Sequence, residues 1–196
     1  MDPANENTVH IGLSSWIIQD GNYPDFRQGE ERSFAVEFNV KAAVETKSPT
    51  QGLIQYIEGS QYHAIGRVVH RDKSVWVVDF GFRAFCEGRP PRNAVTGRLL
   101  EGDYQLGVDP YFYFECLHAR PNVPPLIYDW RIRQILIETA PFIESRMLDG
   151  RRLLARDPAQ RGLREIHETD AWNDDDGDAD YTLVCELFNK PPRSRR

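Results

Sequence analysis

The stretch LLEGDYQLGVDPYFYFEC, from Leu99 to Cys116, alternates two kinds of residue over almost its whole length. Its even-numbered positions are mostly apolar, whereas its odd-numbered positions are mostly acidic or polar. A period of two is typical of a β-strand with one face on a core and the other towards water. The pattern therefore predicts a polar strand face, whose candidate binding residues are Glu101, Asp103, Gln105, Asp109, Tyr111, Tyr113 and Glu115.

This segment is too long for one straight strand, because its extended chain would span more than about 50 Å at roughly 3.3 Å per residue. Gly107 and the pair Asp109–Pro110 are the expected bend, since proline cannot donate to a sheet and glycine tolerates unusual dihedral angles. A bulge there would turn the later odd positions inward. We therefore expect the shared polar face to hold as far as Gly107.

Other segments repeat the β pattern. Phe34 to Val44 alternates cleanly, and Tyr62–His70 and Val75–Cys86 predict a hairpin. The start of the second hairpin strand, Val75–Val78, is apolar on both faces, which indicates a strand covered on both sides or one that leaves the core for a second contact. We expect a β-rich α+β fold: a single antiparallel β-barrel or strongly bent sheet of six to seven strands. An OB-like barrel and a two-sheet sandwich are the alternatives.

The region before the last strand carries helix signals. Thr139 suits a cap, Pro141 an early helical position, and Ile143, Met147 and Leu154 recur at helical spacing. We therefore predict one or two short helices inserted at about 140–168. Six arginines here form either a solvated face or an intramolecular partner for the acidic strand face; they are Arg146, Arg151, Arg152, Arg156, Arg161 and Arg164.

The predicted domain organisation is a single β-rich domain over residues 1–189. An acidic loop follows the helical insertion at 168–180, and residues 190–196 are predicted to form a disordered basic tail. The three cysteines, Cys86, Cys116 and Cys185, each follow the parity of apolar neighbours, so we expect buried reduced thiols in a cytoplasmic protein.

Composition limits the partners. The net charge is −6, with 40% hydrophobic and 28% charged residues, so the chain has the makeup of a globular protein and repels phosphate backbones. The polar, acidic first residues differ from a secretory signal, and no apolar run approaches the roughly 18 residues of a membrane helix. We expect no membrane association and no general affinity for nucleic acid.

Known catalytic and metal motifs fail in detail. An EF-hand register set by Gly177 places Trp172 and Leu183 where acids are needed. Asp103 and Tyr104 stand where a P-loop requires Lys and Ser or Thr. The histidines do not follow metal-ligand spacing. We therefore predict no metal, no cofactor and no assigned catalytic residue.

Three functional classes follow from the residues. The leading hypothesis is a non-enzymatic acidic module, similar in physics to inhibitor or immunity proteins, that binds a basic protein partner through the acidic and tyrosine-bearing strand face. An OB-like oligonucleotide-binding barrel is the first alternative, with bases stacked on strand aromatics. An enzyme of unrecognised type that uses the strand carboxylates is the second. In the oligonucleotide-binding alternative, the aromatic residues that could stack on bases are Trp76, Phe80, Phe82, Tyr111 and Tyr113.

Overall fold

A computed structural model describes residues 8–48, 50–146 and 152–194. Strands dominate the described chain, and its helices are short: α1 (Ser15–Gln19), the π-helix η1 (Tyr113–Leu117), and the 3-10 helices η2 (Pro158–Gln160) and η3 (Asp174–Gly177). A separate two-stranded sheet consists of β10 (Phe142–Arg146) and β11 (Arg152–Arg156). The main sheet has eleven strands: β1 (Thr8–Ser14), β2 (Glu31–Phe34), β3 (Val36–Thr46), β4 (Gly52–Glu58), β5 (Gln61–Arg71), β6 (Val75–Asp79), β7 (Arg83–Glu87), β8 (Leu99–Val108), β9 (Tyr128–Glu138), β12 (Leu163–Ile166) and β13 (Asp180–Leu187).

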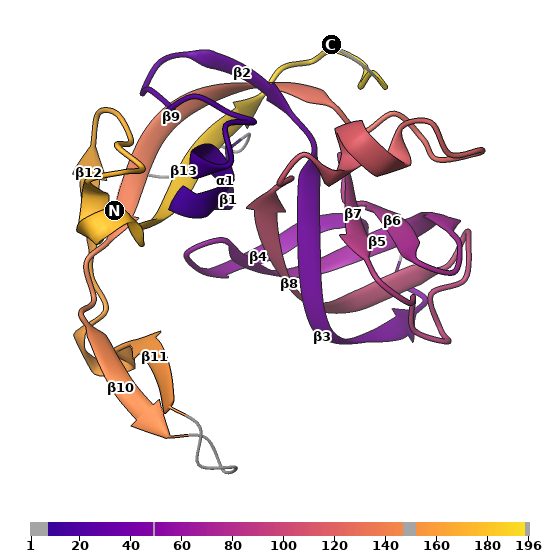
Figure 1. Cartoon of the computed structure of the whole chain (residues 1–196). Helices are drawn as coiled ribbons and strands as arrows, with labels where there is room; N and C mark the ends of the chain where they lie inside the picture. Colours follow the sequence, from indigo (N-terminus) through magenta and orange to yellow (C-terminus); the bar gives the residue numbers. More distant parts are fainter. Residues whose placement is uncertain (1–7, 49, 147–151, 195–196) are drawn as a thin grey trace.

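The main sheet has two halves that meet at β1 and β8 (Figure 1). One half runs β12-β9-β13-β1, with antiparallel neighbours, and β2 pairs with β9 as well. The other half is strongly curled, because β8 pairs with β3 along one edge and with β5 along the other. A parallel contact between Gly12 and Gly107 joins the halves.

The predicted β-rich, strongly bent sheet is confirmed in this general form. The sheet is mixed, because β3 also pairs with β7 in parallel, and it is not a closed barrel. Its eleven strands exceed the six to seven that were predicted. Among the additional strands, β7 arises because the predicted strand Val75–Cys86 divides into β6 and β7, and β12 lies in the region that was predicted to be helical.

Alternation places the core as predicted along β3 and β8. On β8, Leu100, Tyr104 and Leu106 are buried, and the ring of Phe38 on β3 packs edge-on against Tyr104 with a centroid separation of 5.5 Å. Burying a large apolar side chain stabilises a fold by about 1.5–3 kcal/mol. These residues therefore fix the polar positions of both strands on the opposite face.

β6 is covered on both sides. Trp76 and Val78 belong to the main core, whereas Val75 and Val77 pack in a second cluster with Tyr113 and Leu117 of η1. This arrangement explains the two-sided apolar pattern at Val75–Val78 and confirms the first of its two predicted explanations.

The strand predicted to continue to Cys116 ends at Val108. Pro110 has no N–H to extend the ladder, Tyr111 adopts a left-handed backbone with φ 80°, and η1 follows. Asp109 and Tyr113 are buried here, so the prediction that they belong to an exposed strand face is wrong. The chain leaves the strand at the bend that was expected after Gly107, although the alternating sequence pattern continues beyond it.

Apart from the short η2, the predicted helical insertion at 140–168 is also wrong. Phe142–Arg146 and Arg152–Arg156 form the antiparallel hairpin β10–β11, and β12 adds to the edge of β9. Across the hairpin the Arg156 guanidinium lies over the Phe142 ring, 3.9 Å from its centroid. Pro158 begins only the short η2, capped by the side chain of Asp157. Met147, one of the residues behind the helix prediction, lies outside the described residues.

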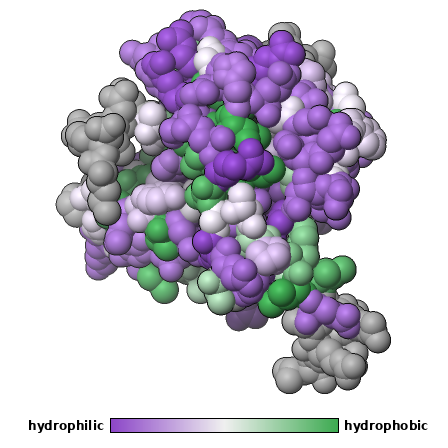
Figure 2. Space-filling view, turned by 90° about the vertical axis from the view of Figure 1, so that its left-hand side faces the viewer, coloured by the Kyte–Doolittle hydropathy of each residue, from purple (hydrophilic) through white to green (hydrophobic). Residues whose placement is uncertain are grey.

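The hairpin projects from the body of the molecule (Figure 1). Its hydrophobic surface is visible at the lower right of a face that is otherwise largely hydrophilic (Figure 2). Leu154 is 69% exposed, and Phe142 and Ile143 are each 40% exposed. A helix would place residues 143, 147 and 154 on one buried stripe, whereas the hairpin leaves its described apolar side chains largely uncovered.

Two further predictions differ from the structure. The basic tail is predicted to be disordered, yet Arg193 exchanges backbone hydrogen bonds with Ile127 and its side chain lies 2.7 Å from Asp129. Residues 195–196 lie outside the described part. Of the cysteines, Cys185 is buried and Cys86 half-buried, whereas Cys116 is exposed on η1 because the helix replaces the predicted strand. Among the described residues, no helix is both long and apolar enough to cross a membrane.

Candidate functional site

A cleft of about 710 Å³ lies where the two halves of the sheet meet. Gly12 of β1 and Gly107 of β8 are cross-strand neighbours within its lining. A Cβ on Gly12 would approach Ser60 Oγ to 3.1 Å, and one on Gly107 would approach Glu37 Oε1 to 3.3 Å. The two glycines thus leave the space that the neighbouring polar side chains occupy. Ligand clefts commonly have volumes of about 300–1,000 Å³.

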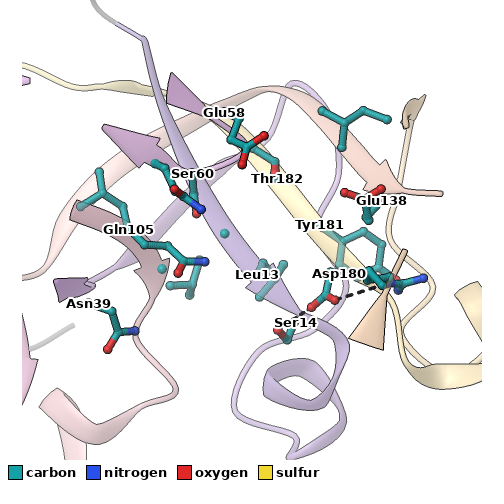
Figure 3. A pocket seen from close by; sticks show the side chains of 18 of the residues that line it. Leu13, Ser14, Asn39, Glu58, Ser60, Gln105, Glu138, Asp180, Tyr181 and Thr182 are labelled. Atoms are coloured by element: carbon teal, nitrogen blue, oxygen red, sulfur yellow. Dashed lines mark hydrogen bonds and ion pairs between the residues drawn. The ribbon is translucent and has the colours of Figure 1, made fainter. Parts of the chain in front are cut away.

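Polar side chains line the cleft on both sides of β1 (Figure 3). Asn39, Ser60 and Gln105 lie on the side of the curled half, and Asp180 and Thr182 lie on the side of β13. Asp180 accepts a hydrogen bond of 2.9 Å from the Ser14 hydroxyl. The side chain amides, hydroxyls and carboxylates together offer many acceptors to a bound group.

Acidic groups outnumber basic groups in this lining, because four carboxylates (Glu37, Glu58, Glu138 and Asp180) accompany two arginines (Arg156 and Arg161). Both arginines are already engaged. Arg161 pairs with Glu58, and Arg156 pairs with Asp175 and lies 3.7 Å from Asp180. The cleft therefore favours a cationic ligand over an anionic one.

Glu37 is the half-buried carboxyl of the cleft. It faces Gly107 across the β3–β8 ladder and Phe85 across the β3–β7 pair. Burial raises the pKa of Glu37 to about 7, and repulsion from Glu87 acts in the same direction. Within the part of the chain that the structure describes, no cation forms an ion pair with Glu37.

The outer face of β8 continues from the cleft. Gln105 and Gly107 line the cleft, and Asp103 and Glu101 follow at every second position away from it. Asp103 has a side chain that is 69% exposed, and Glu101 one that is 36% exposed. The arginine-rich segment, whose alternative interpretation was a partner for this face, forms the hairpin β10–β11 and strand β12 instead. The carboxylates of this face are therefore accessible.

His63 of β5 lies between these two carboxylates. Its Nδ1 is 2.8 Å from Asp103 Oδ1, and its Nε2 is 3.2 Å from Glu101 Oε1. The hydrogen bonds to Asp103 and, second, to Glu101 raise the pKa of His63. A protonated His63 would offset part of the negative charge of this face. The face therefore becomes more negative as pH rises and His63 loses its proton.

The seven predicted binding residues thus divide into two groups. Glu101, Asp103 and Gln105 share the outer face of β8, and Gln105 reaches the cleft. The other four, Asp109, Tyr111, Tyr113 and Glu115, lie beyond the end of the strand.

Among those four, the side chains serve the turn and the second core. Asp109 accepts hydrogen bonds from the backbone N–H of Tyr113 at 3.1 and 3.3 Å, and burial raises the pKa of Asp109 to about 7. Tyr111 is half-buried, and Glu115 is exposed on η1. These four residues do not join the carboxylates of β8 on one face.

Sequence reasoning missed Glu37, His63, Glu58 and Asp180 as site residues. The alternation in Phe34–Val44 does place Glu37 on the polar side of its strand. Which strands pair, and in which register, has no local signal. His63 meets Asp103 and Glu37 meets Gly107 only through the pairing of β5 and β3 with β8.

The aromatic residues proposed for base stacking are mostly part of the core. Trp76, Phe80, Phe82 and Tyr113 are each 4% exposed or less, so their ring faces are not available to a base. Tyr111 is half-buried and contacts Tyr23 edge-on. Four of the five aromatic residues on which the oligonucleotide-binding alternative depends are therefore in the core.

No group of three or more His, Cys, Asp or Glu side chains within residues 8–48, 50–146 and 152–194 is arranged to hold a metal ion. In the acidic loop, Asp174 instead accepts a hydrogen bond from the Tyr181 hydroxyl, and Asp170 accepts from Asn173. No family model matches the chain, and no curated protein or solved structure matches it.

Proposed function

We propose that this protein binds a basic segment of a partner protein in the cleft between the two halves of its sheet, with the outer face of β8 as an extension of that site. The observation that carries the proposal is the excess of carboxylates in the cleft, where both arginines are already paired with acids. A cation that enters the cleft is attracted by this excess negative charge, and it meets no unpaired arginine among the described residues of the lining.

The outer face of β8 also favours a basic ligand. Asp103 and Glu101 are accessible, and they lie on the strand face that leads to Gln105 in the cleft. Such carboxylates attract a basic chain over a distance of about a Debye length, roughly 8–10 Å at physiological salt. We expect them to contribute mainly to the association rate and to the salt dependence.

The test is a fluorescence-anisotropy titration with a labelled nine-residue peptide that carries three lysines, and with the same peptide carrying three glutamates. We expect the lysine peptide to bind and its affinity to fall about tenfold between low salt and 0.3 M salt, because exposed charges are screened. The glutamate peptide should not bind.

Two sets of variants locate the binding. Glu138→Gln and Asp180→Asn each remove a cleft charge and keep an oxygen for the hydrogen bonds that these side chains accept. The double reversal of Glu101 and Asp103 to lysine tests the β8 face, with Glu115→Lys as the matched control on η1. Weaker binding in both sets, but not in Glu115→Lys, supports the proposal. Equal binding in all of them would refute it.

A further inference from the structure

Glu37 differs from the other carboxylates of the cleft in having no partner among the described residues. Glu58 pairs with Arg161, and Asp180 accepts from the Ser14 hydroxyl. Glu138 accepts hydrogen bonds from the backbone N–H of Ala140 and Gly162 at 3.0 and 3.3 Å. Glu37 is thus the cleft carboxyl whose entire hydrogen-bonding capacity remains for a ligand.

The surroundings of Glu37 disfavour its charge in the absence of a ligand. Glu87 on β7 repels it, and Asp109 at the end of β8 and Cys86 on β7 are the other titratable groups close enough to interact with it. None of these groups is cationic. A half-buried carboxylate without a counter-charge destabilises a fold, and a cation from outside would remove this penalty.

The neighbouring cleft residues suit an ammonium or guanidinium group. Asn39 and Gln105 are cross-strand partners that both line the cleft, and Ser60 borders Gly12 in the same lining. An ammonium carries three N–H donors and a guanidinium five, and neither accepts hydrogen bonds. Two amide oxygens and one hydroxyl beside a carboxylate supply the acceptors that such a donor group needs.

We propose that Glu37 receives the cationic head of one lysine or arginine side chain of the basic partner and is the residue that selects for a positive charge at that position. This inference rests on the proposed function and adds the specificity determinant of the site. The other carboxylates then contribute general attraction, whereas Glu37 discriminates a charged side chain from a neutral one of similar shape.

Binding of a cation at Glu37 should depend on pH. Bound cation favours the ionised form of Glu37, so binding releases a proton wherever the free carboxyl is protonated. Affinity for the cation should therefore be highest above pH 7 and should fall as the solution is acidified. His63 contributes in the same direction, because its protonation offsets charge on the β8 face. A comparison of variants is needed to separate the two groups.

The experiment uses the full chain and two labelled peptides that differ in one group. Both carry two flanking lysines; the central residue is lysine in one and Nε-acetyl-lysine in the other. At pH 8 we expect the wild type to prefer the lysine peptide about tenfold, the usual scale for a hydrogen bond to a charged group. Glu37→Gln should lose most of this preference, and the wild type at pH 5.5 should resemble that variant.

Glu37→Gln removes a charge that burial disfavours, so the variant should fold at least as well as the wild type. Glu115→Gln is the matched control and should keep the preference. If Glu37→Gln discriminates the two peptides as the wild type does, the inference is wrong while the proposed function stands. If neither peptide binds the wild type, both fail.

A second measurement does not depend on peptide affinity. The side-chain carboxyl ¹³C signal of Glu37, followed by NMR between pH 5 and 9, reports its titration directly. Saturating Nα-acetyl-lysine methylamide should lower the pKa of Glu37, because the ammonium favours the ionised form. An unchanged titration of Glu37 in the presence of this probe would overturn the inference.

Discussion

The two parts of the segment Leu99–Cys116 share one alternating sequence pattern but form different structures. In β8, up to Val108, the odd positions face outward and carry the accessible Glu101 and Asp103. Beyond Val108, Asp109 is fully buried and the chain then turns into η1. Alternation therefore predicts a strand only while neighbouring strands continue to offer hydrogen-bond partners.

The contrast in thiol exposure gives the largest expected effect. Cys116 is exposed on η1, whereas Cys185 is fully buried and burial raises the pKa of the Cys185 thiol. We expect Cys116 to react with a maleimide at least about a hundredfold faster than Cys185 in the native protein. Peptide mapping by mass spectrometry at successive times measures both rates. Slow labelling of Cys116 would indicate that this residue faces the core from a strand, as the sequence pattern predicted, and would contradict η1.

Removal of the Asp109 carboxyl should give the next largest effect. Asp109→Ala leaves buried backbone N–H groups of the η1 turn without an acceptor, at a cost of about 2–3 kcal/mol in the free energy of unfolding at pH 6. Asp103→Ala, on the accessible part of the same segment, should cost less than about 1 kcal/mol. Urea titrations compare the two variants. Equal losses would contradict the division of the segment.

The boundary between the two parts should show in the pH dependence of stability. The pKa values of Glu37 and Asp109 are about 7 in the fold, above the ordinary values of 4.5 and 3.8. A folded-state pKa above the unfolded one gives stability that is complete below the unfolded value and is lost as pH rises through the folded value. The wild type should therefore lose stability between about pH 4 and 8.

Glu37→Gln isolates one of these contributions. At pH 8 the variant should be about 1–2 kcal/mol more stable than the wild type, an amount reduced from the full linkage value because Glu37 is only half-buried. Near pH 4 the two proteins should be nearly equal. Thermal or urea unfolding at both pH values provides the measurement, and a variant that is less stable at pH 8 would show that Glu37 has an unrecognised partner.

The smallest effect concerns the accessible part of the segment. Asp103→Asn should lower the pKa of His63, and Glu101→Gln should lower it less, because the bond to Asp103 is the stronger influence. An NMR titration of the His63 ring protons distinguishes the variants. No change in either would mean that β5 and β8 do not bring these side chains together.

The sequence predicts the fold where a single strand determines its own burial. Phe34–Val44 and Leu99–Val108 alternate cleanly, and the apolar positions of both enter the core. The hairpin β10–β11 and strand β12 were missed, because Ile143 and Leu154 fit a helical stripe and the edge of β9 that β12 joins is not visible in the local sequence. Pairing with the distant β9 decided β12, whereas β10 and β11 pair with each other in a separate sheet.

The same limit applies to the site. Glu101, Asp103 and Gln105 follow from alternation alone, so their outward placement was predictable. The cleft was not, because it depends on Gly12 meeting Gly107 across β1 and β8, far apart in sequence. Glu37 acquires its unusual environment from the pairing of β3 with β8 and β7 and not from its own neighbours in the chain.

The most direct test of the account is to map where a cationic peptide binds. In an NMR titration of the ¹⁵N-labelled chain with the trilysine peptide, the largest amide shift changes should fall on cleft residues such as Gly12, Gln105, Gly107 and Thr182. Glu115 on η1 and the acidic turn at Asp174–Gly177 should change little. Shift changes concentrated at that turn, or spread evenly over all acidic surfaces, would contradict a cleft built to receive a basic partner.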